Sequence, residues 1–350
     1  MRGAVQQALL KAAESIVLDD RSIPQPRAGE ALVRIRSVGV CGSDMHMYRF
    51  GQIGGIRIDD AGGPFVPGHE AAGIVEAVGE GVSADLVGRR VAIEPTINCG
   101  QCPWCLAGQA NVCPHHTFLG LPGCDGALRQ YMTHPARLCV PVGDELTDDE
   151  LVMLEPLAIA VHALDRAGWA GGQGALVLGA GPIGLSILCL LASAGADPIV
   201  VTDKLDYRLN LASELGATCT LNPTRDDVPA AVKKIGGGYG LPFVFEAVGE
   251  QQTFEHMVAC AAPAGIVAVV GISASDHLGF PHAPARRKGL DLRMVRRSNH
   301  TLERALRWAK SRHLPLGRFI THHYPLADVQ KAYDQVSRYA DGVVKSVIQP

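Results

Sequence analysis

The sequence lacks a strong net charge of either sign. Its 350 residues include 32 Lys and Arg against 35 Asp and Glu, which gives a formal net charge of −3. A chain so balanced has no long-range attraction for phosphate backbones or anionic membranes. We therefore expect neither nucleic acid nor a membrane surface as a partner.

The N-terminal segment lacks the unbroken apolar core of a signal peptide. Lys11 and several acidic residues interrupt its first twenty positions. This predicts an intracellular, cytoplasmic location, where thiols stay reduced and disulfides are rare. The ten cysteines are then expected to bind metal or to remain buried thiols.

Charge is also absent from Ala167 to Ala196, a stretch long enough to cross a bilayer. Glycines crowd its beginning, and Gly179, Gly181, Pro182 and Gly184 interrupt its middle. The segment therefore predicts a short strand, a glycine turn and a buried helix rather than a membrane span.

The pattern of the chain changes near Leu151. Before it, short β-rich runs alternate with Gly and Pro turns, which is typical of an irregular, mostly antiparallel β domain. After it, strands alternate with helices, which predicts a doubly wound α/β fold with a parallel sheet covered on both faces. From about Leu292 the pattern is mixed again, and we expect these closing elements to return to the first domain. Two domains suit this length.

The stretch VLGAGPIG (177–184) contains G-x-G-x-x-G between an apolar strand and a helix. Such glycines permit a tight turn, close approach of a pyrophosphate and close helix–strand contact. Asp203 ends the next strand, where a carboxylate accepts hydrogen bonds from ribose hydroxyls and repels a 2′-phosphate, which favours NAD over NADP. Lys204 and Arg208 are close by and would soften this preference. The alternative is a helix-packing turn with a surface Asp.

The stretch CGQCPWCLAGQANVC (99–113) contains four cysteines spaced C-x2-C-x2-C-x7-C. Four thiolates at these spacings can enclose one Zn²⁺ in a closed tetrahedron, which predicts a structural rather than a catalytic metal. The predicted ligands are Cys99, Cys102, Cys105 and Cys113. Residues 96–119 include no Lys or Arg, which argues against a zinc loop that binds nucleic acid.

A catalytic metal needs ligands that are far apart in sequence and an open coordination position. Candidates are Cys41 in GVCGSDMH, His69 and Glu70 in PGHE, and Glu155 in MLEPLAIA. Taken singly, each has a plainer interpretation, such as a buried thiol or a carboxylate at a helix start.

Together these motifs, with EPLAIAVHA and GAGPIG, resemble in order and spacing the zinc-dependent medium-chain dehydrogenases. The chain is most similar to the polyol branch, the sorbitol and xylitol dehydrogenases, because Glu155 stands where the alcohol dehydrogenase branch has Cys. The phrases RVAIEP (90–95) and RFGQIGG (49–55) favour the same branch. The resemblance implies a GroES-like β domain over 1–152 and 295–350, with a zinc lobe at about 96–115, and a Rossmann NAD-binding domain over 153–294.

The same resemblance implies an enzyme with two zincs per chain and NAD, assembled as a homotetramer. Cys41, His69 and Glu155 would bind the catalytic zinc, and Glu70 would hold a zinc-bound water or exchange as a ligand. Asp44 would orient His69, Ser43 would take the substrate proton, and His46 would pass it to water. The remaining residues implied for the cofactor are Pro182, Ile183, Val270, Ile272 and Arg296, and those implied for the substrate are Tyr48, Phe118, Glu155 and Arg296.

The expected reaction is oxidation of a secondary alcohol of a polyol to a ketone, with hydride transfer to NAD. Animal sorbitol dehydrogenases have lost most of the structural cysteines, whereas all four are present here. This departure resembles bacterial members and the L-threonine dehydrogenases, so oxidation of a β-hydroxy amino acid remains the alternative. An alternative of another class is a non-catalytic zinc-loop binding or sensor protein.

Overall fold

The structure is a computed structural model and describes residues 4–350. The chain forms two compact units. The first runs up to Glu155 and also includes Ala305–Lys310 and Leu316–Pro350, and the second includes Pro156–Arg304 and Ser311–Pro315.

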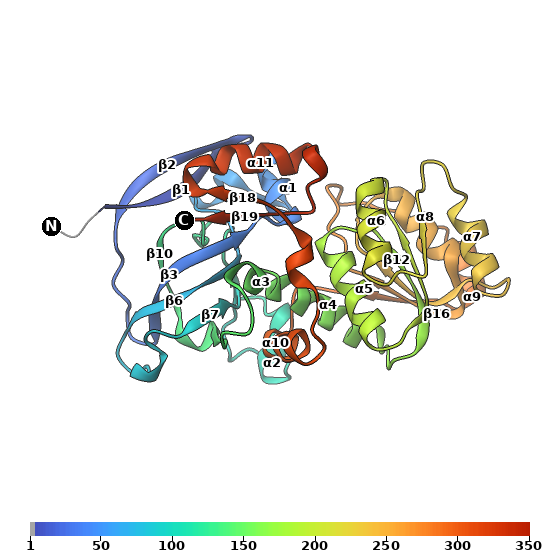
Figure 1. The fold of residues 1–350 in the computed structure, drawn as a ribbon, viewed down its shortest axis with the longest axis horizontal. Coiled ribbons are helices and arrows are strands. Elements are labelled where there is room, and N and C mark those ends of the chain that lie inside the picture. Colours follow the sequence, from blue (N-terminus) through green and yellow to red (C-terminus); the bar gives the residue numbers. More distant parts are fainter. Residues whose placement is uncertain (1–3) are drawn as a thin grey trace. The chain divides into compact units, whose positions relative to one another are not determined.

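The first unit is built on a seven-stranded sheet with the order β11-β7-β6-β3-β19-β18, and β10 pairs with β3 beside this path. Neighbouring strands are antiparallel except β18 and β19, which are parallel (Figure 1). Its strands are β1 (Ala4–Ala12), β2 (Ser15–Ser22), β3 (Glu30–Gly39), β4 (Gln52–Ile53), β5 (Ile56–Arg57), β6 (Glu70–Val78), β7 (Arg90–Ile93), β8 (Thr96–Ile97), β9 (Thr117–Phe118), β10 (Tyr131–Pro135), β11 (Cys139–Pro141), β18 (Ile320–Pro325) and β19 (Lys345–Gln349). Its α-helices are α1 (Gly42–Phe50), α2 (Pro103–Leu106), α3 (Asp148–Val152) and α11 (Val329–Ser337).

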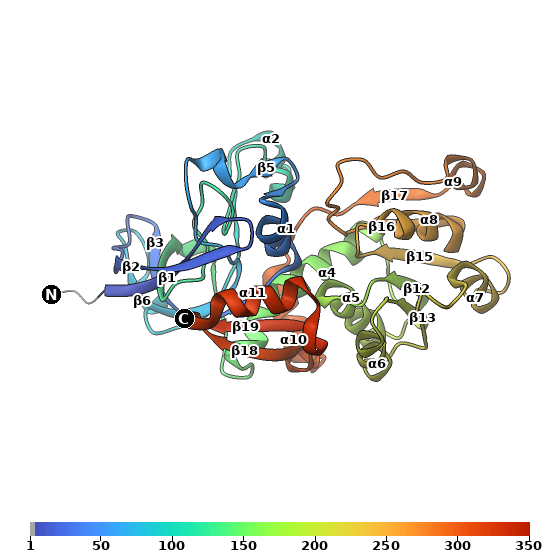
Figure 2. The ribbon, with the colours of Figure 1, turned by 90° about the horizontal axis from the view of Figure 1, so that it is seen from above.

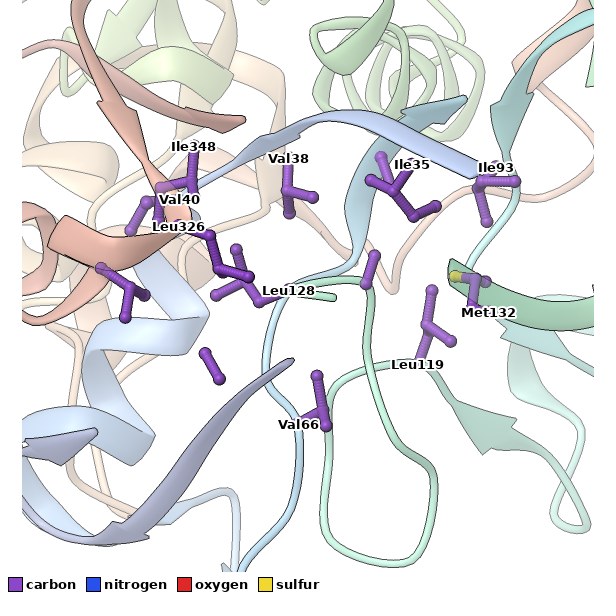
Figure 3. Close-up of a cluster of buried hydrophobic side chains, with 14 of the residues drawn as sticks. Ile35, Val38, Val40, Val66, Ile93, Leu119, Leu128, Met132, Leu326 and Ile348 are labelled. Atoms are coloured by element: carbon purple, nitrogen blue, oxygen red, sulfur yellow. The ribbon is translucent and has the colours of Figure 1, made fainter. Parts of the chain in front are cut away.

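Helix α11 covers this sheet with one apolar face. Val329, Ala332, Tyr333 and Val336 recur at the spacing of a single helix face, and they join the hydrophobic core of the unit. In that core, side chains from β3, β19 and the loops around Val66 and Leu128 converge (Figure 3). The last residues of the chain are thereby packed against some of its first strands.

The second unit contains a six-stranded parallel sheet with the order β14-β13-β12-β15-β16-β17. The run QGALVL of β12 is buried almost throughout, as expected for a parallel strand covered on both faces. Helices α5 and α6 cover one face and α8 and α9 the other (Figure 2). Its elements are α4 (Leu154–Ala167), which begins in the first unit, β12 (Gln173–Leu178), α5 (Pro182–Ser193), β13 (Asp197–Thr202), α6 (Asp206–Glu214), β14 (Cys219–Leu221), α7 (Val228–Ile235), β15 (Leu241–Glu246), α8 (Gln251–Cys260), β16 (Ala261–Val269), α9 (His282–Lys288) and β17 (Asp291–Met294). Helix α10 (Leu302–Ser311) follows β17, and its residues Ala305–Lys310 belong to the first unit.

This architecture confirms the predicted fold class, a GroES-like β domain with a Rossmann sheet. The predicted return of the chain to the first domain at residue 295 comes later, at Ala305. The reason is that β17 extends the parallel sheet beside β16, and the Thr301 hydroxyl then donates to the Ala158 carbonyl of α4. Residues 295–304 therefore belong to the second unit.

The uncharged segment 167–196 forms strand β12, a glycine turn and helix α5, as its glycines predicted. Within residues 4–350, none of the helices combines the length and the apolar character that crossing a bilayer requires.

Candidate metal centres and dinucleotide site

The four cysteines of the 99–113 loop bring their sulfur atoms together. Cys113 Sγ lies 3.5 Å from Cys99 Sγ and 3.8 Å from Cys102 Sγ, and Cys99 Sγ lies 4.0 Å from Cys105 Sγ. A tetrahedron with zinc–sulfur bonds of about 2.3 Å has edges of about 3.8 Å. Gly100 and Gly108 have positive φ angles of 72° and 74°, which allow the loop to turn twice around this point. The four thiols therefore fit a closed zinc site.

A second group of ligand atoms comes from distant positions in the first unit. Atoms of Cys41, His69 and Glu70 lie within 4.8 Å of one another. Cys41 is the residue that precedes α1, and His69 immediately precedes β6. Since β3 and β6 pair with Gly39 opposite Glu70, a side chain at position 39 would collide with Glu70 Oε2. The backbone at Gly39 thus leaves space for the Glu70 carboxylate.

Asp44 holds this site from the first turn of α1. Its Oδ2 atom accepts a hydrogen bond from the Cys41 backbone N–H at 3.0 Å, and its Oδ1 atom lies 3.4 Å from His69 Nδ1. A carboxylate on Nδ1 leaves the other ring nitrogen, Nε2, to bind a metal. Although burial lowers the pKa of the His69 imidazole, Asp44 and Cys41 outweigh this effect and raise the pKa well above its usual value.

Glu155, at the start of α4, is the fourth predicted ligand. It is 4% exposed, and its buried Oε2 atom has no hydrogen-bond partner in the part of the chain that the structure describes, residues 4–350. Burial raises the pKa of its carboxyl to about 8, and the nearby Glu70 adds to the rise while His69 opposes it. A buried carboxylate needs a counter-charge, and a cation among these groups would supply it. Glu155 lies outside the group of three atoms that are already within 4.8 Å.

Lys345 is a residue of the site that the sequence analysis missed. Its ammonium lies 2.5 Å from Glu70 Oε2 and donates to the Val40 carbonyl at 3.0 Å, and its side chain is 1% exposed. In the sequence, the one indication of its role is a positive charge within the otherwise uncharged stretch GVVKSVIQ (342–349). Because Lys345 neutralises Glu70, the uncompensated buried carboxyl of the site is that of Glu155.

Ser43 and Phe118 lie beside His69 at the same centre. Ser43 Oγ is 3.4 Å from His69 Nε2, and the Phe118 ring centroid is 5.0 Å from that of His69. His46 follows Ser43 by one turn of α1, and burial, with a contribution from Arg49, lowers the pKa of its imidazole. Its ring is therefore neutral near pH 7 and able to accept a proton.

Tyr48 does not line this site, which corrects the expectation that it contacts substrate. Its side chain is fully buried, and its hydroxyl donates to Asp334 at 2.7 Å and accepts from Gln330 at 2.5 Å. Tyr48 lies on the face of α1 that packs against α11, so this tyrosine stabilises the contact between the two helices.

In the second unit, the glycine turn between β12 and α5 has the geometry of a phosphate-binding loop. Gly179 has a φ angle of 99°, and a Cβ atom on Gly184 would collide with the Gly179 carbonyl oxygen. At Gly181 the nearest atom to an added Cβ, at 3.8 Å, belongs to Arg208, so that space remains for a phosphate. Pro182 and Ile183 open α5, whose first N–H groups point at this space.

Asp203 follows β13 and faces the glycine turn. Its Oδ2 atom accepts from the Ala180 N–H at 2.8 Å and lies 3.9 Å from Arg208 Nη1. Lys204 instead pairs with Glu250 at 2.5 Å. Arg208 is therefore the basic residue that stands beside Asp203.

The other predicted cofactor residues follow the strands of the same sheet. Val270 directly follows β16, and its N–H donates to the Glu246 carbonyl at 2.7 Å. Ile272 is 50% exposed in the same loop, and Arg296 is exposed in the loop after β17. All three follow the carboxyl ends of parallel strands, where ligands of such sheets bind.

Comparison with known proteins agrees with this geometry. Residues 27–144 match the alcohol dehydrogenase GroES-like domain, and residues 182–311 match the zinc-binding dehydrogenase family. The L-arabinitol 4-dehydrogenase of Hypocrea jecorina is 34% identical over 92% of this chain and 86% of its own length. The sorbitol dehydrogenase of Bacillus subtilis (strain 168) is 29% identical over 99% of this chain and 97% of its own.

A crystal structure of an alcohol dehydrogenase from Escherichia coli CFT073, solved with NADH, superposes with a TM-score of 0.90 at 28% identity and covers 99% of both chains. The chain thus belongs to the zinc-dependent medium-chain dehydrogenases. It is an oxidoreductase of CH–OH groups that uses zinc and a nicotinamide dinucleotide.

Proposed function

We propose that this enzyme oxidises a secondary hydroxyl of a polyol to a ketone with NAD as the acceptor. The observation that carries the proposal is the convergence of Cys41, His69 and Glu70, together with a buried oxygen of Glu155 that has no hydrogen-bond partner among residues 4–350. The names of the relatives, L-arabinitol 4-dehydrogenase and sorbitol dehydrogenase, support the substrate class.

Cys41, His69 and Glu155 would hold the catalytic zinc. Glu70, which is paired with Lys345, would be available to exchange as a ligand. When bound there, zinc acts as a Lewis acid that makes a substrate hydroxyl easier to deprotonate. Ser43 is placed to receive that proton, because its hydroxyl lies beside the metal-facing nitrogen of His69. His46, neutral and half-buried, would pass the proton to water.

Phe118 would form an apolar wall of the substrate pocket, since its ring contacts that of His69. Arg296 would bind further hydroxyls of the substrate, as the family resemblance implies. In the second unit, Asp203 would accept hydrogen bonds from the adenosine ribose of NAD. Gly181 and the first turn of α5 would receive the pyrophosphate.

The proposal includes a cytoplasmic location and a homotetramer. All ten cysteines are free thiols, which suits a reducing compartment. Self-association is supported by the edge strand β17, which exposes Leu292 (36%) and Met294 (67%) along an unpaired side. Light scattering after size-exclusion chromatography tests the tetramer.

A screen of NADH release across polyols, β-hydroxy amino acids and simple secondary alcohols tests the reaction. We expect turnover of pentitols or hexitols and none of L-threonine. Turnover of L-threonine alone would assign the enzyme to the hydroxy amino acid alternative. Absence of turnover in a protein with two bound zincs would favour the non-catalytic sensor.

A further inference from the structure

Tyr333 carries a buried hydroxyl that has no hydrogen-bond partner among residues 4–350. Its side chain is 0% exposed, and its ring packs edge-on against Tyr48 with a centroid distance of 5.3 Å and an interplanar angle of 67°. An unpaired buried hydroxyl costs about 1–3 kcal/mol, so it is rare in native proteins and calls for an explanation.

The neighbouring tyrosine does not satisfy this hydroxyl, because the Tyr48 oxygen is already bonded to Asp334 and Gln330. Helix α1, on which Tyr333 packs, carries Asp44 one turn before Tyr48. Burial, and after it the acidic groups of Asp44, Cys41 and Glu70, raise the pKa of the Tyr333 hydroxyl well above its usual value of 10. The hydroxyl therefore keeps its proton, and the acidic groups that act on it electrostatically belong to the candidate catalytic metal site.

Among these acceptors, Asp44 has the greatest unused capacity. A carboxylate offers about four acceptor positions, and Asp44 uses one for the Cys41 N–H and one facing His69. Glu70 is instead neutralised by Lys345. Metal binding through His69 Nε2 leaves the ring proton on Nδ1, which faces Asp44 Oδ1 at 3.4 Å, and a buried carboxylate that orients a metal ligand gains from a further hydrogen-bond donor.

We propose that Tyr333 is a positioning residue of the catalytic metal site, whose hydroxyl donates a hydrogen bond to the Asp44 carboxylate when the ligands close on the metal. The inference rests on the proposed metal site. Tyr333 then donates to Asp44, and Asp44 accepts from His69 Nδ1–H. Through this chain of hydrogen bonds, a residue of α11 fixes the orientation of the histidine ring.

The test is the substitution Tyr333→Phe, which keeps the ring and its contact with Tyr48. The matched control is Tyr324→Phe, which also removes a hydroxyl bonded to α11, that of Tyr324 to Gln335 at 2.5 Å. Each protein is treated with a mild chelator until one zinc per chain remains, and Co²⁺ is then titrated into the emptied site. The affinity and the d–d absorption bands of the bound Co²⁺ are recorded, together with the unfolding midpoint of the chelated protein.

For Tyr333→Phe we expect about 10-fold weaker Co²⁺ binding and shifted d–d bands, with an unchanged or higher unfolding midpoint before Co²⁺ is added. Tyr324→Phe should bind Co²⁺ like the wild type. Equal affinity and equal spectra for Tyr333→Phe and wild type would overturn the inference while leaving the proposed function intact. A parallel loss of stability in chelated Tyr333→Phe would also overturn it, because the hydroxyl would then act in folding. If wild-type protein bound only one metal, the proposed function would fail first, and the inference with it.

Discussion

Lys345 Nζ and Glu70 Oε2 form an ion pair 2.5 Å long in which both side chains are 1% exposed. The pair joins β19 to the first residue of β6, and 275 positions separate its partners in sequence. Glu70 is also one of the three groups that converge at the candidate catalytic metal centre. The ion pair thus links the stability of the sheet to the state of that centre.

The first prediction concerns this pair. Lys345→Met leaves the Glu70 carboxylate buried without a counter-charge, so we expect the free energy of unfolding to fall by about 3–5 kcal/mol. Adding Glu70→Gln to this variant should restore most of the loss, because no uncompensated charge then remains. Denaturant unfolding of the chelated proteins measures both effects, and an equal loss in the single and double variants would refute the pairing.

The second prediction concerns pH. The pKa of Glu155 is raised from 4.5 to about 8, so the folded protein without catalytic metal retains a proton that the unfolded chain releases at lower pH. Stability must therefore fall as pH rises from 4.5 to 8, by roughly 3 kcal/mol at pH 7. Glu155→Gln should remove this slope and, in the loaded enzyme, weaken zinc binding. Unfolding of the chelated protein at pH 5 and pH 7 measures the slope, and its persistence in Glu155→Gln would contradict the assignment.

The third prediction concerns cofactor choice. Asp203→Ala removes the carboxylate that would bind the ribose hydroxyls and that lies beside Arg208. We expect kcat/KM for NAD to fall about 10-fold or more and the ratio of NADP to NAD use to rise. The control is Asp206→Asn, which removes the same charge from a residue bonded instead to Asn222 and Arg225. An unchanged ratio in Asp203→Ala would show that Asp203 faces no ribose.

The fourth prediction separates the two metals. Cys105→Ser should lose one zinc per chain and lower the thermal stability, because the lobe is closed around its ion. Cys41→Ser should also lose one zinc but keep the fold and abolish turnover. Cys139→Ser, which alters a buried thiol outside both groups, should retain two zincs. Metal analysis and thermal unfolding of the three variants distinguish these outcomes.

The parts of the site that were predictable from sequence are those whose residues lie close together in the chain at a characteristic spacing. Four cysteines within fifteen positions, and three glycines between a strand and a helix, each define a turn of the chain by themselves. Cys41, His69 and Glu155 are far apart, and they were predicted through the resemblance of their motifs to a family rather than from the residues singly.

The residues that were missed or misplaced depend on tertiary packing. Lys345 was visible only as a lone charge in an apolar strand, and nothing local indicated that Glu70 was its partner. Tyr48 was wrongly predicted to line the substrate pocket. Its position in the sequence shows which face of the helix it occupies, but not that α11 packs against that face. Helix α11 was not predicted at all, although Val329, Ala332, Tyr333 and Val336 have the spacing of an amphipathic helix.

The C-terminal segment contributes Lys345 to a centre whose other groups come from the first half of the chain. During synthesis, Glu70 leaves the ribosome long before its lysine does. The Glu70 carboxylate can therefore acquire its buried counter-charge only after β19 has been made and has paired with β3.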